Sequence, residues 1–383
     1  MPKLKILVLL MLVLALGTAG YAPACSAADP GDIKIGMNVS VTGPSAAQGA
    51  LFIKAIRLAE KQVNQTGGVN GRKIQVVLLD SQSTNPGSLA ALNRGVEVEK
   101  VVAVIGPVMS TQILAISDAV KGFAVPNLVG GTAVALTRQG NPWLFRVRPD
   151  DSLSAAAMVR YIKEDLKFTK VGILHDSDAF GSGGADLVEK GAKEAGLVIV
   201  RRDKFTTGTK DFTAQLLGLK SAGAEVMVMY SPHPEDAAVL QRQYRQLGSP
   251  FKYIGSTGSA AKDALALSRE ASEGIMAVVD YVPGASDVTK KYAEDYRKEY
   301  NADMDSLAAW NYDALNLLVG VMQKVGEDRA KIREALLATQ GYQGVLGTFS
   351  FSPNGDGLHQ VSVIRVEKGE HKLLKVINLG LNP

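Results

Sequence analysis

Cysteine is almost absent from this chain, since Cys25 is the only one among 383 residues. It lies close to the N-terminus, in a segment that we expect to be removed, so we expect the mature chain to form no disulfide and to have no thiol nucleophile. Histidine is nearly as scarce, and the four side chains are too scattered for metal-ligand spacing. They are His175, His233, His359 and His371. We therefore expect no metal site.

Long apolar runs are also missing, except for one at the N-terminus. Lys3 and Lys5 precede an uninterrupted apolar run from 6 to 16, and small residues follow as far as Ala28. This order is typical of a secretory signal, and the run is much shorter than the roughly 20 residues that span a bilayer. We predict a signal peptide over 1–28 and export to the periplasm. A retained membrane anchor is the alternative.

Cys25 allows a second mode of export, because the small residues 22–24 before it are typical of a lipid attachment site. Such sites usually carry Leu three residues before the cysteine, where this chain has Ala22. We therefore favour a soluble mature protein over lipid anchoring through Cys25.

Charge of one sign is not in excess. The chain has 42 basic and 38 acidic side chains, and loss of Lys3 and Lys5 with the signal leaves a net charge of +2. Since no Lys/Arg-rich run occurs either, we expect no binding to nucleic acid. Hydrophobic residues make up 46% and charged residues 21%, which is ordinary globular composition. The length suits two domains, each with its own core.

Catalytic and cofactor-binding motifs are absent as well. The sequence contains no phosphate-binding loop, no Gly-x-Gly-x-x-Gly after a strand and no Gly-x-Ser-x-Gly. The segment 354–357 resembles part of a calcium loop, but it lacks the first acidic position and the distal Glu, so we expect a hairpin turn. We therefore predict a protein that is not an enzyme and binds no cofactor.

Short apolar runs alternate with amphipathic segments from Ile33 onward, and the pattern restarts after Pro149. Such alternation predicts an α/β fold of two doubly wound lobes with parallel sheets. The predicted strands are 33–39, 74–80, 101–105 and 126–129, then 170–175, 198–204, 225–230 and 252–255. The predicted helices are 46–65, 86–99 and 111–121, then 152–165, 183–195, 212–222 and 234–247. A third, mainly helical part has helices 287–300, 306–324 and 329–338, followed by strands 347–351 and 360–366.

Two loops at predicted strand ends are suited to an anionic ligand. In open α/β sheets, ligands bind beyond the carboxyl ends of the strands, near helix N-termini. Ser110 is placed to cap the next helix with its hydroxyl facing the cleft. In the loop 130–133, Gly131 and Thr132 let a ligand approach the backbone closely. The pattern favours a carboxylate held by neutral donors, whereas plain helix capping and a tight turn are the structural alternatives.

Several short motifs occur in an order and spacing that cover nearly the whole mature chain. They are Thr42-Gly43-Pro44-Ser45-Ala46-Ala47-Gln48-Gly49, Val104-Ile105-Gly106-Pro107 with Ser110, Phe145-Arg146 with Pro149, His175-Asp176 with Phe180-Gly181, Gly208 with Asp211-Phe212, and Tyr312-Asp313-Ala314. In this arrangement the chain resembles the periplasmic solute-binding receptors of the branched-chain amino acid type.

This resemblance implies a type I periplasmic binding protein, with two lobes joined by a three-crossing hinge and a ligand cleft between them. Lobe 1 would combine 29–148 with 280–345, and lobe 2 would combine 149–279 with 346–383. The family's ligand carboxylate is held by residues that match Ser110, Gly131 and Thr132. The implied partner is the membrane permease of an ABC importer, and we expect a monomer.

Other positions depart from the amino-acid receptors. Phe180 replaces a Tyr that closes on the ligand, and His233 or its neighbour Pro234 replaces a second Tyr. Gln48 stands at an aromatic position of the first loop. Most importantly, Thr257 stands where these receptors place a Glu that pairs with the ligand's ammonium.

The absence of that Glu predicts a ligand that has a carboxylate but need not have an α-amino group. A buried ammonium without a carboxylate partner lacks a charge-assisted hydrogen bond of about 1.5–3 kcal/mol. Aromatic, hydroxy and keto acids are the candidate ligands. Asp280, Glu235 or Asp236 could restore the missing charge, which would leave an amino acid as the ligand.

Two other classes of function remain open from the sequence. One is a sensory or regulatory ligand-binding domain of the same fold, although no long apolar segment follows Val366. The other is an exported α/β enzyme, for which the sequence offers no nucleophile, metal set or cofactor loop. A transport receptor is the interpretation that we favour.

Overall fold

The computed structural model describes residues 31–305 and 307–380. The described chain from Ile33 onward forms one compact unit. The predicted signal peptide and Cys25 lie outside the described residues. Within those ranges, no helix is long and apolar enough to cross a membrane.

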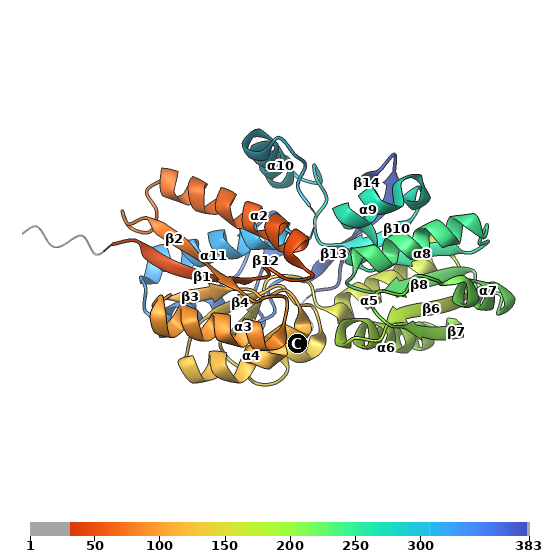
Figure 1. Ribbon diagram of the computed structural model, residues 1–383, viewed down its shortest axis with the longest axis horizontal. Helices are drawn as coiled ribbons and strands as arrows, with labels where there is room; N and C mark the ends of the chain where they lie inside the picture. Colours follow the sequence, from red (N-terminus) through yellow and green to blue (C-terminus); the bar gives the residue numbers. More distant parts are fainter. Residues whose placement is uncertain (1–30, 306, 381–383) are drawn as a thin grey trace, which may run out of the picture. The chain divides into compact units, whose positions relative to one another are not determined.

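The first sheet has five strands, all parallel, in the order β2-β1-β3-β4-β5. The chain winds first to one edge and then to the other, which places helix α2 on one face and α3 and α4 on the opposite face (Figure 1). The strands are β1 (Ile33–Val39), β2 (Ile74–Asp80), β3 (Ala103–Ile105), β4 (Asn127–Val129) and β5 (Leu144–Arg146). The helices are α2 (Ala46–Gln65), α3 (Asn85–Asn93) and α4 (Ser110–Phe123). Because both faces are covered, strands β3 and β4 are buried along their whole length, and so is β5 at the edge of the sheet.

The second sheet has seven strands in the order β14-β13-β10-β9-β8-β6-β7. Its strands from β6 to β10 are parallel, whereas β13 and β14 are antiparallel additions at one edge. The strands are β6 (Lys170–Asp176), β7 (Val198–Phe205), β8 (Val226–Tyr230), β9 (Lys252–Gly255), β10 (Met276–Val279), β13 (Gln360–Glu367) and β14 (Glu370–Asn378). The helices are α5 (Asp151–Tyr161), α6 (Ala179–Glu194), α7 (Thr213–Ser221), α8 (Pro234–Gln246) and α9 (Lys262–Ser268).

The remaining helices belong with the first sheet, although they follow the second in sequence. They are α10 (Asp287–Tyr300), α11 (Ala309–Val325) and α12 (Arg329–Leu337), followed by a small hairpin of β11 (Tyr342–Gln343) and β12 (Thr348–Phe349). Helix α11 packs on α2, where the rings of Phe52 and Trp310 meet edge to face with centroids 6.1 Å apart. The chain therefore passes between the two halves three times, after β5, after β10 and before β13.

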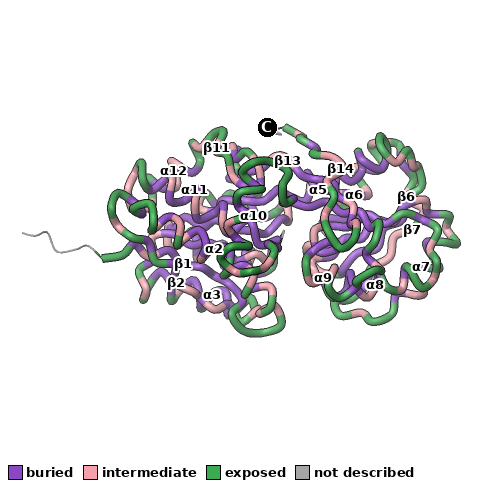
Figure 2. The backbone as a smooth tube through the Cα atoms, turned by 90° about the horizontal axis from the view of Figure 1, so that it is seen from above, coloured by how far each residue is buried: buried purple, intermediate pink, exposed green. Residues whose placement is uncertain are grey.

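The predicted class of fold is confirmed, including two doubly wound lobes and three crossings. Burial follows the same plan, since the inner strands of both sheets are buried, whereas the edge strands β7 and β14 and the outer sides of the helices are more exposed (Figure 2). Strand β5 was not predicted, and the predicted helix 86–99 is α3 followed by a π-helical turn over Arg94–Val98. Leu346, Phe349 and Leu358 pack in the core of the first sheet, although the predicted division placed them with the second lobe.

Candidate ligand-binding pocket

A pocket lies at the carboxyl ends of strands from both sheets. It contains about 500 Å³ of space between atoms, part of which is open solvent. Its lining includes five of the seven predicted residues and several that were not predicted. The lining residues are Gln48, Val108, Met109, Ser110, Thr111, Thr132, Arg148, Asp178, Phe180, Pro232, Thr257 and Leu307. Gly131 and His233 are not among them.

Ser110 lines the pocket, but the prediction that it caps helix α4 is wrong. The helix begins at Ser110 itself, the cap position is Met109, and no side chain caps this end. The Ser110 Oγ instead accepts a hydrogen bond from the backbone N–H of Ala133 at 3.3 Å. The hydroxyl proton of Ser110 is therefore not needed for this contact and is free to donate to a ligand oxygen.

Gly131 supports the pocket from behind. A Cβ at this position would lie 2.4 Å from the Cδ1 of Ile113 and 3.2 Å from the Ser110 Oγ. A side chain here would have to displace the ends of the Ile113 and Leu136 side chains, so glycine favours the close approach of this loop to helix α4. The side chain of Thr132 also forms a hydrogen bond with Asp151, a buried carboxyl at the start of α5.

Phe180 forms part of the wall from the second half of the molecule. It lies in the first turn of α6 and packs on Tyr230, with ring centroids 5.0 Å apart. The Tyr230 hydroxyl donates to Asp151 Oδ1 at 2.9 Å. Burial raises the pKa of Asp151 to about 7, although the hydrogen bonds from Tyr230 and Thr132 act in the opposite direction. The hydroxyl of Tyr230 therefore belongs to a ring that packs on Phe180, but it already donates to Asp151.

His233 does not line the pocket, and neither does Pro234, whereas Pro232 does. His233 precedes helix α8, and its Nε2 lies 3.8 Å from Asp178 Oδ2 and 4.0 Å from Asp176 Oδ2. The imidazole therefore faces the two acids that flank the start of α6.

Asp178 is an acidic residue of the pocket lining that the sequence analysis missed. It caps helix α6, because its Oδ1 accepts from the Gly181 N–H at 2.6 Å. Burial raises the pKa of Asp178, and the neighbouring charge of Asp176 adds to this effect. Asp178 could have been predicted from its position just after β6, since side chains at the carboxyl ends of strands face a cleft.

Thr257 lines the pocket in a short 3₁₀ turn after β9. None of the three acids named as substitutes for the missing Glu lines the pocket. Asp280 pairs with Arg148, Asp236 Oδ1 accepts from the Gly208 N–H at 3.0 Å, and Glu235 lies in the first turn of α8.

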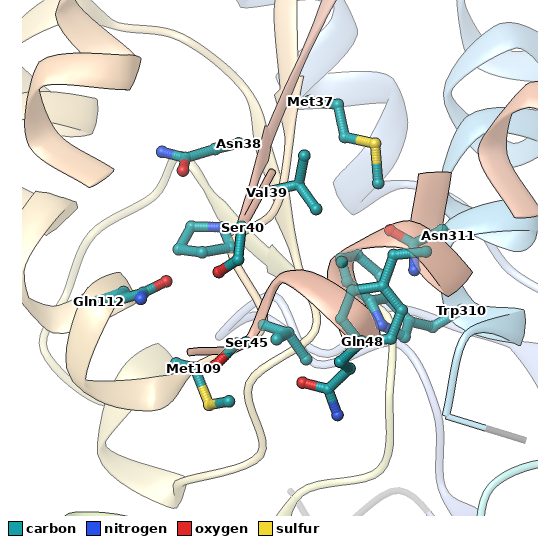
Figure 3. A pocket seen from close by; sticks show the side chains of 14 residues that line it. Met37, Asn38, Val39, Ser40, Ser45, Gln48, Met109, Gln112, Trp310 and Asn311 are labelled. Atoms are coloured by element: carbon teal, nitrogen blue, oxygen red, sulfur yellow. The ribbon is translucent and has the colours of Figure 1, made fainter. Parts of the chain in front are cut away.

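Gln48 lies in the first turn of α2 and belongs to two neighbouring cavities. Besides the main pocket, it lines a smaller cavity together with Trp310 and Asn311 (Figure 3). In this cavity the buried Trp310 Nε1 and Asn311 Oδ1 have no hydrogen-bond partner within the described residues. Met109 separates the two spaces and lines both.

Arg148 is the second charged residue of the pocket lining that was not predicted from the sequence. It follows β5 and is only 4% exposed. Its Nε donates to Asp280 Oδ2, and its Nη1 donates to the carbonyl oxygen of Gly130 at 2.8 Å. Arg148 follows β5 by two residues. Because this strand was not predicted, the position of Arg148 at a strand end was not recognised.

Two α/β halves linked by three crossings, with a pocket at their strand ends, define the class of solute-binding proteins that enclose a small ligand. A family model described as periplasmic binding protein matches residues 32–371. The chain belongs to this family of binding proteins, which are not enzymes, and one similar structure is named as the substrate-binding protein of a branched-chain amino acid transporter.

Two similar proteins are named for amino acids. A leucine-, isoleucine-, valine-, threonine- and alanine-binding protein of Pseudomonas aeruginosa is 30% identical over 347 residues, which cover 89% of this chain and 91% of that protein. The crystal structure of the leucine-binding protein LivK of Thermotoga maritima is 29% identical, with a TM-score of 0.83 over 91% of this chain and 99% of that one.

A third similar structure is named for a different ligand. A solute-binding protein of an ABC transporter from Rhodopseudomonas palustris, in complex with 3,4-dihydroxybenzoic acid, has a TM-score of 0.82 over 91% of this chain and 97% of that one. At 22% identity, this likeness establishes the fold alone.

Proposed function

We propose that this chain is the extracytoplasmic receptor of an ABC importer and that it binds a small carboxylate-bearing solute in the pocket at Ser110 and Thr132. The observation that carries the proposal is the free hydroxyl donor of Ser110, which lies against the glycine loop at a helix N-terminus and is not used for capping. Helix N-termini favour anions because their first N–H groups lack intrahelical partners.

The solute that fits best is an aromatic, hydroxy or keto acid. Thr257 supplies no negative charge for an ammonium, and none of the three acids named from the sequence lines the pocket. Val108, Met109 and Leu307 give the pocket an apolar wall, and Phe180 adds a ring that suits a flat or branched apolar body.

An α-amino acid is the second candidate, and Asp178 is the observation that favours it. Asp178 lines the pocket and is only half-buried. Its carboxylate can therefore pair with a ligand's ammonium from the end of β6, whereas Thr257 lies at the end of β9. The amino-acid names of the relatives agree with this candidate.

Calorimetric titration with leucine and with 4-methyl-2-oxopentanoate tests the two candidates, because these acids differ only at the α-position. Benzoate adds an aromatic acid to the series. We expect the keto acid or benzoate to bind more tightly than leucine. Tighter binding of leucine would overturn the first candidate in favour of the second.

We also propose that lobe 1 (29–148 with 280–358) and lobe 2 (149–279 with 359–383) close on the solute and that the closed monomer is recognised by a membrane permease. Small-angle scattering should then show a smaller radius of gyration with ligand than without. The cleavage after Ala28 and the absence of a lipid on Cys25 remain predictions, which the intact mass of the exported protein tests.

A further inference from the structure

We propose that Arg148 is the charged residue that binds the carboxylate of the solute, through its Nη2 group. The inference rests on the proposed function, since it assumes an anionic solute in this pocket. It adds a charged donor to a site that the sequence predicted to use neutral donors only.

The guanidinium of Arg148 is fixed by its other two nitrogens. The Nε is held by Asp280 and the Nη1 by the carbonyl oxygen of Gly130, which directly precedes the loop of Gly131 and Thr132. These contacts come from two strand ends, after β10 and after β4. The group is therefore oriented before a ligand arrives, which lowers the entropy lost on binding.

The Nη2 of Arg148 is buried and makes no hydrogen bond within the described residues. Buried polar atoms without a partner are rare in folded proteins. A few others occur among the described residues, and of these Arg148 is the only charged residue and the only one that lines the main pocket. An acceptor oxygen of a ligand would complete its hydrogen bonding.

Arg148 also lies where the main pocket adjoins a second, smaller cavity. A smaller cavity behind the main pocket shares four lining residues with it, namely Thr132, Arg148, Phe180 and Thr257. A carboxylate placed at this junction would have Thr132 and the Arg148 guanidinium on one side and the ring of Phe180 on another. The apolar body of the solute would then extend toward Met109 and Leu307.

The charge of Arg148 is balanced by Asp280 in the free pocket, so the binding group is a neutral pair rather than a bare cation. This arrangement keeps the buried arginine stable without a ligand. A carboxylate gains a short, charge-assisted hydrogen bond to Nη2, whereas Asp280 is held on the Nε side of the guanidinium. A neutral carboxamide would gain much less.

The test measures how strongly the pocket prefers an acid to its amide. The probes are three matched pairs: benzoate and benzamide, 4-methyl-2-oxopentanoate and its amide, and leucine and leucinamide. For the pair whose acid binds the wild-type protein, we expect the acid to bind at least about 30-fold more tightly than the amide. This ratio reports on the anionic group and is insensitive to a general loosening of the fold.

Two variants alter Arg148 without leaving Asp280 as an unpaired buried charge. Arg148→Lys keeps a cation beside Asp280 but lacks the planar group that reaches both Asp280 and the ligand. The double variant Arg148→Gln with Asp280→Asn removes both charges together. We expect the acid-to-amide ratio to fall at least fivefold in Arg148→Lys and to fall close to 1 in the double variant.

Arg146→Lys is the matched control, because Arg146 is equally buried but has partners for all its nitrogens. It should lower the thermal midpoint and leave the ratio unchanged. If the double variant fails to fold, Arg148→Lys decides the matter. An unchanged ratio in a folded Arg148 variant overturns the inference alone, whereas a wild-type protein that binds none of the three acids overturns the proposed function as well.

Discussion

Two buried arginines stand two residues apart at the end of β5, and each pairs with an aspartate far away in sequence. Arg146 binds Asp356 through Nε at 2.8 Å, and its remaining nitrogens donate to Ala133 O, Thr137 Oγ1 and Val134 O. Arg148 binds Asp280 and a carbonyl oxygen and has one nitrogen left over. The two pairs have similar burial but differ in how completely their hydrogen bonds are satisfied.

The difference separates a structural role from a binding role. A buried ion pair with every donor used joins segments of the fold, and Arg146 joins β5 to the turn before β13 in this way. A buried pair with a spare donor at a pocket wall has capacity for a third partner. The proposed binding role of Arg148 therefore rests on its unsatisfied donor, since burial and charge do not distinguish it from Arg146.

The largest effect should come from breaking the structural pair. Asp356→Ala leaves Arg146 as an uncompensated buried charge and removes an acceptor from Thr137 and Arg138. We expect a loss of about 3–5 kcal/mol in the free energy of unfolding, measured by urea denaturation. Asp303→Ala removes the partner of Arg297 in an exposed pair and should change the stability little. Equal losses in both variants would contradict the structural role of Asp356.

The next effect concerns the pocket itself. Ser110→Ala removes the neutral donor of the carboxylate site, so we expect solute affinity to fall ten- to hundredfold, or about 1.4–2.8 kcal/mol. The thermal midpoint should fall slightly, because the variant loses the hydrogen bond from the Ala133 N–H although Ser110 does not cap its helix. Ser117→Ala on the same helix removes a buried hydroxyl that contacts Asn141, away from the pocket. That control should lower stability and leave calorimetric affinity unchanged.

A charge placed at Thr257 should sharpen the choice of ligand. Thr257→Glu supplies the carboxylate that an ammonium needs, and we expect it to shift the preference toward leucine over 4-methyl-2-oxopentanoate by about tenfold, or ~1.4 kcal/mol. Thr257→Gln has the same shape without the charge and should produce no such shift. If both variants behave alike in calorimetry, charge at this position does not select the ligand.

The smallest effect should be a dependence of stability on pH. Burial raises the pKa of Asp151 to about 7 from 3.8, so the folded state keeps a proton that the unfolded state has lost. The contribution to stability is complete below pH 4 and is lost as the pH rises through 7. We expect the free energy of unfolding to fall by about 1 kcal/mol from pH 6 to pH 8 because of this group.

Asp151→Asn should remove that part of the pH dependence, which urea denaturation at several pH values would measure. Asp313 contributes a similar fall, since burial also raises its pKa to about 7. Asp356 behaves in the opposite way. Burial acts to raise its pKa, but the charge of Arg146 and hydrogen bonds from three side chains lower it. An unchanged pH profile in Asp151→Asn would contradict the assignment of Asp151.

The amino-acid sequence by itself determined the layered fold and much of the pocket. The alternation of apolar runs and amphipathic segments is a local property, so it predicted most strands and helices to within a few residues. The rule that ligands bind at strand ends indicated the loops of Ser110 and Thr132, whereas the resemblance to the amino-acid receptors indicated Phe180 and Thr257. All four residues line the pocket, and their contact with a ligand remains a prediction. Strands β5, β10, β11 and β14 were not predicted, and β5 and β11 are short segments without a clear alternating pattern.

Only the tertiary structure decided which polar groups are free. Ser110 was expected to cap a helix, and Arg148 and Asp178 were not noticed, because hydrogen-bond partners come from segments far apart in the chain. Asp280 lies 132 residues from Arg148. No local pattern shows that Asp280 accepts from the Nε of this guanidinium, that the Gly130 carbonyl oxygen accepts from its Nη1, or that its Nη2 has no partner within the described residues. Local propensity set the elements, whereas the packing of distant strand ends set the chemistry of the pocket.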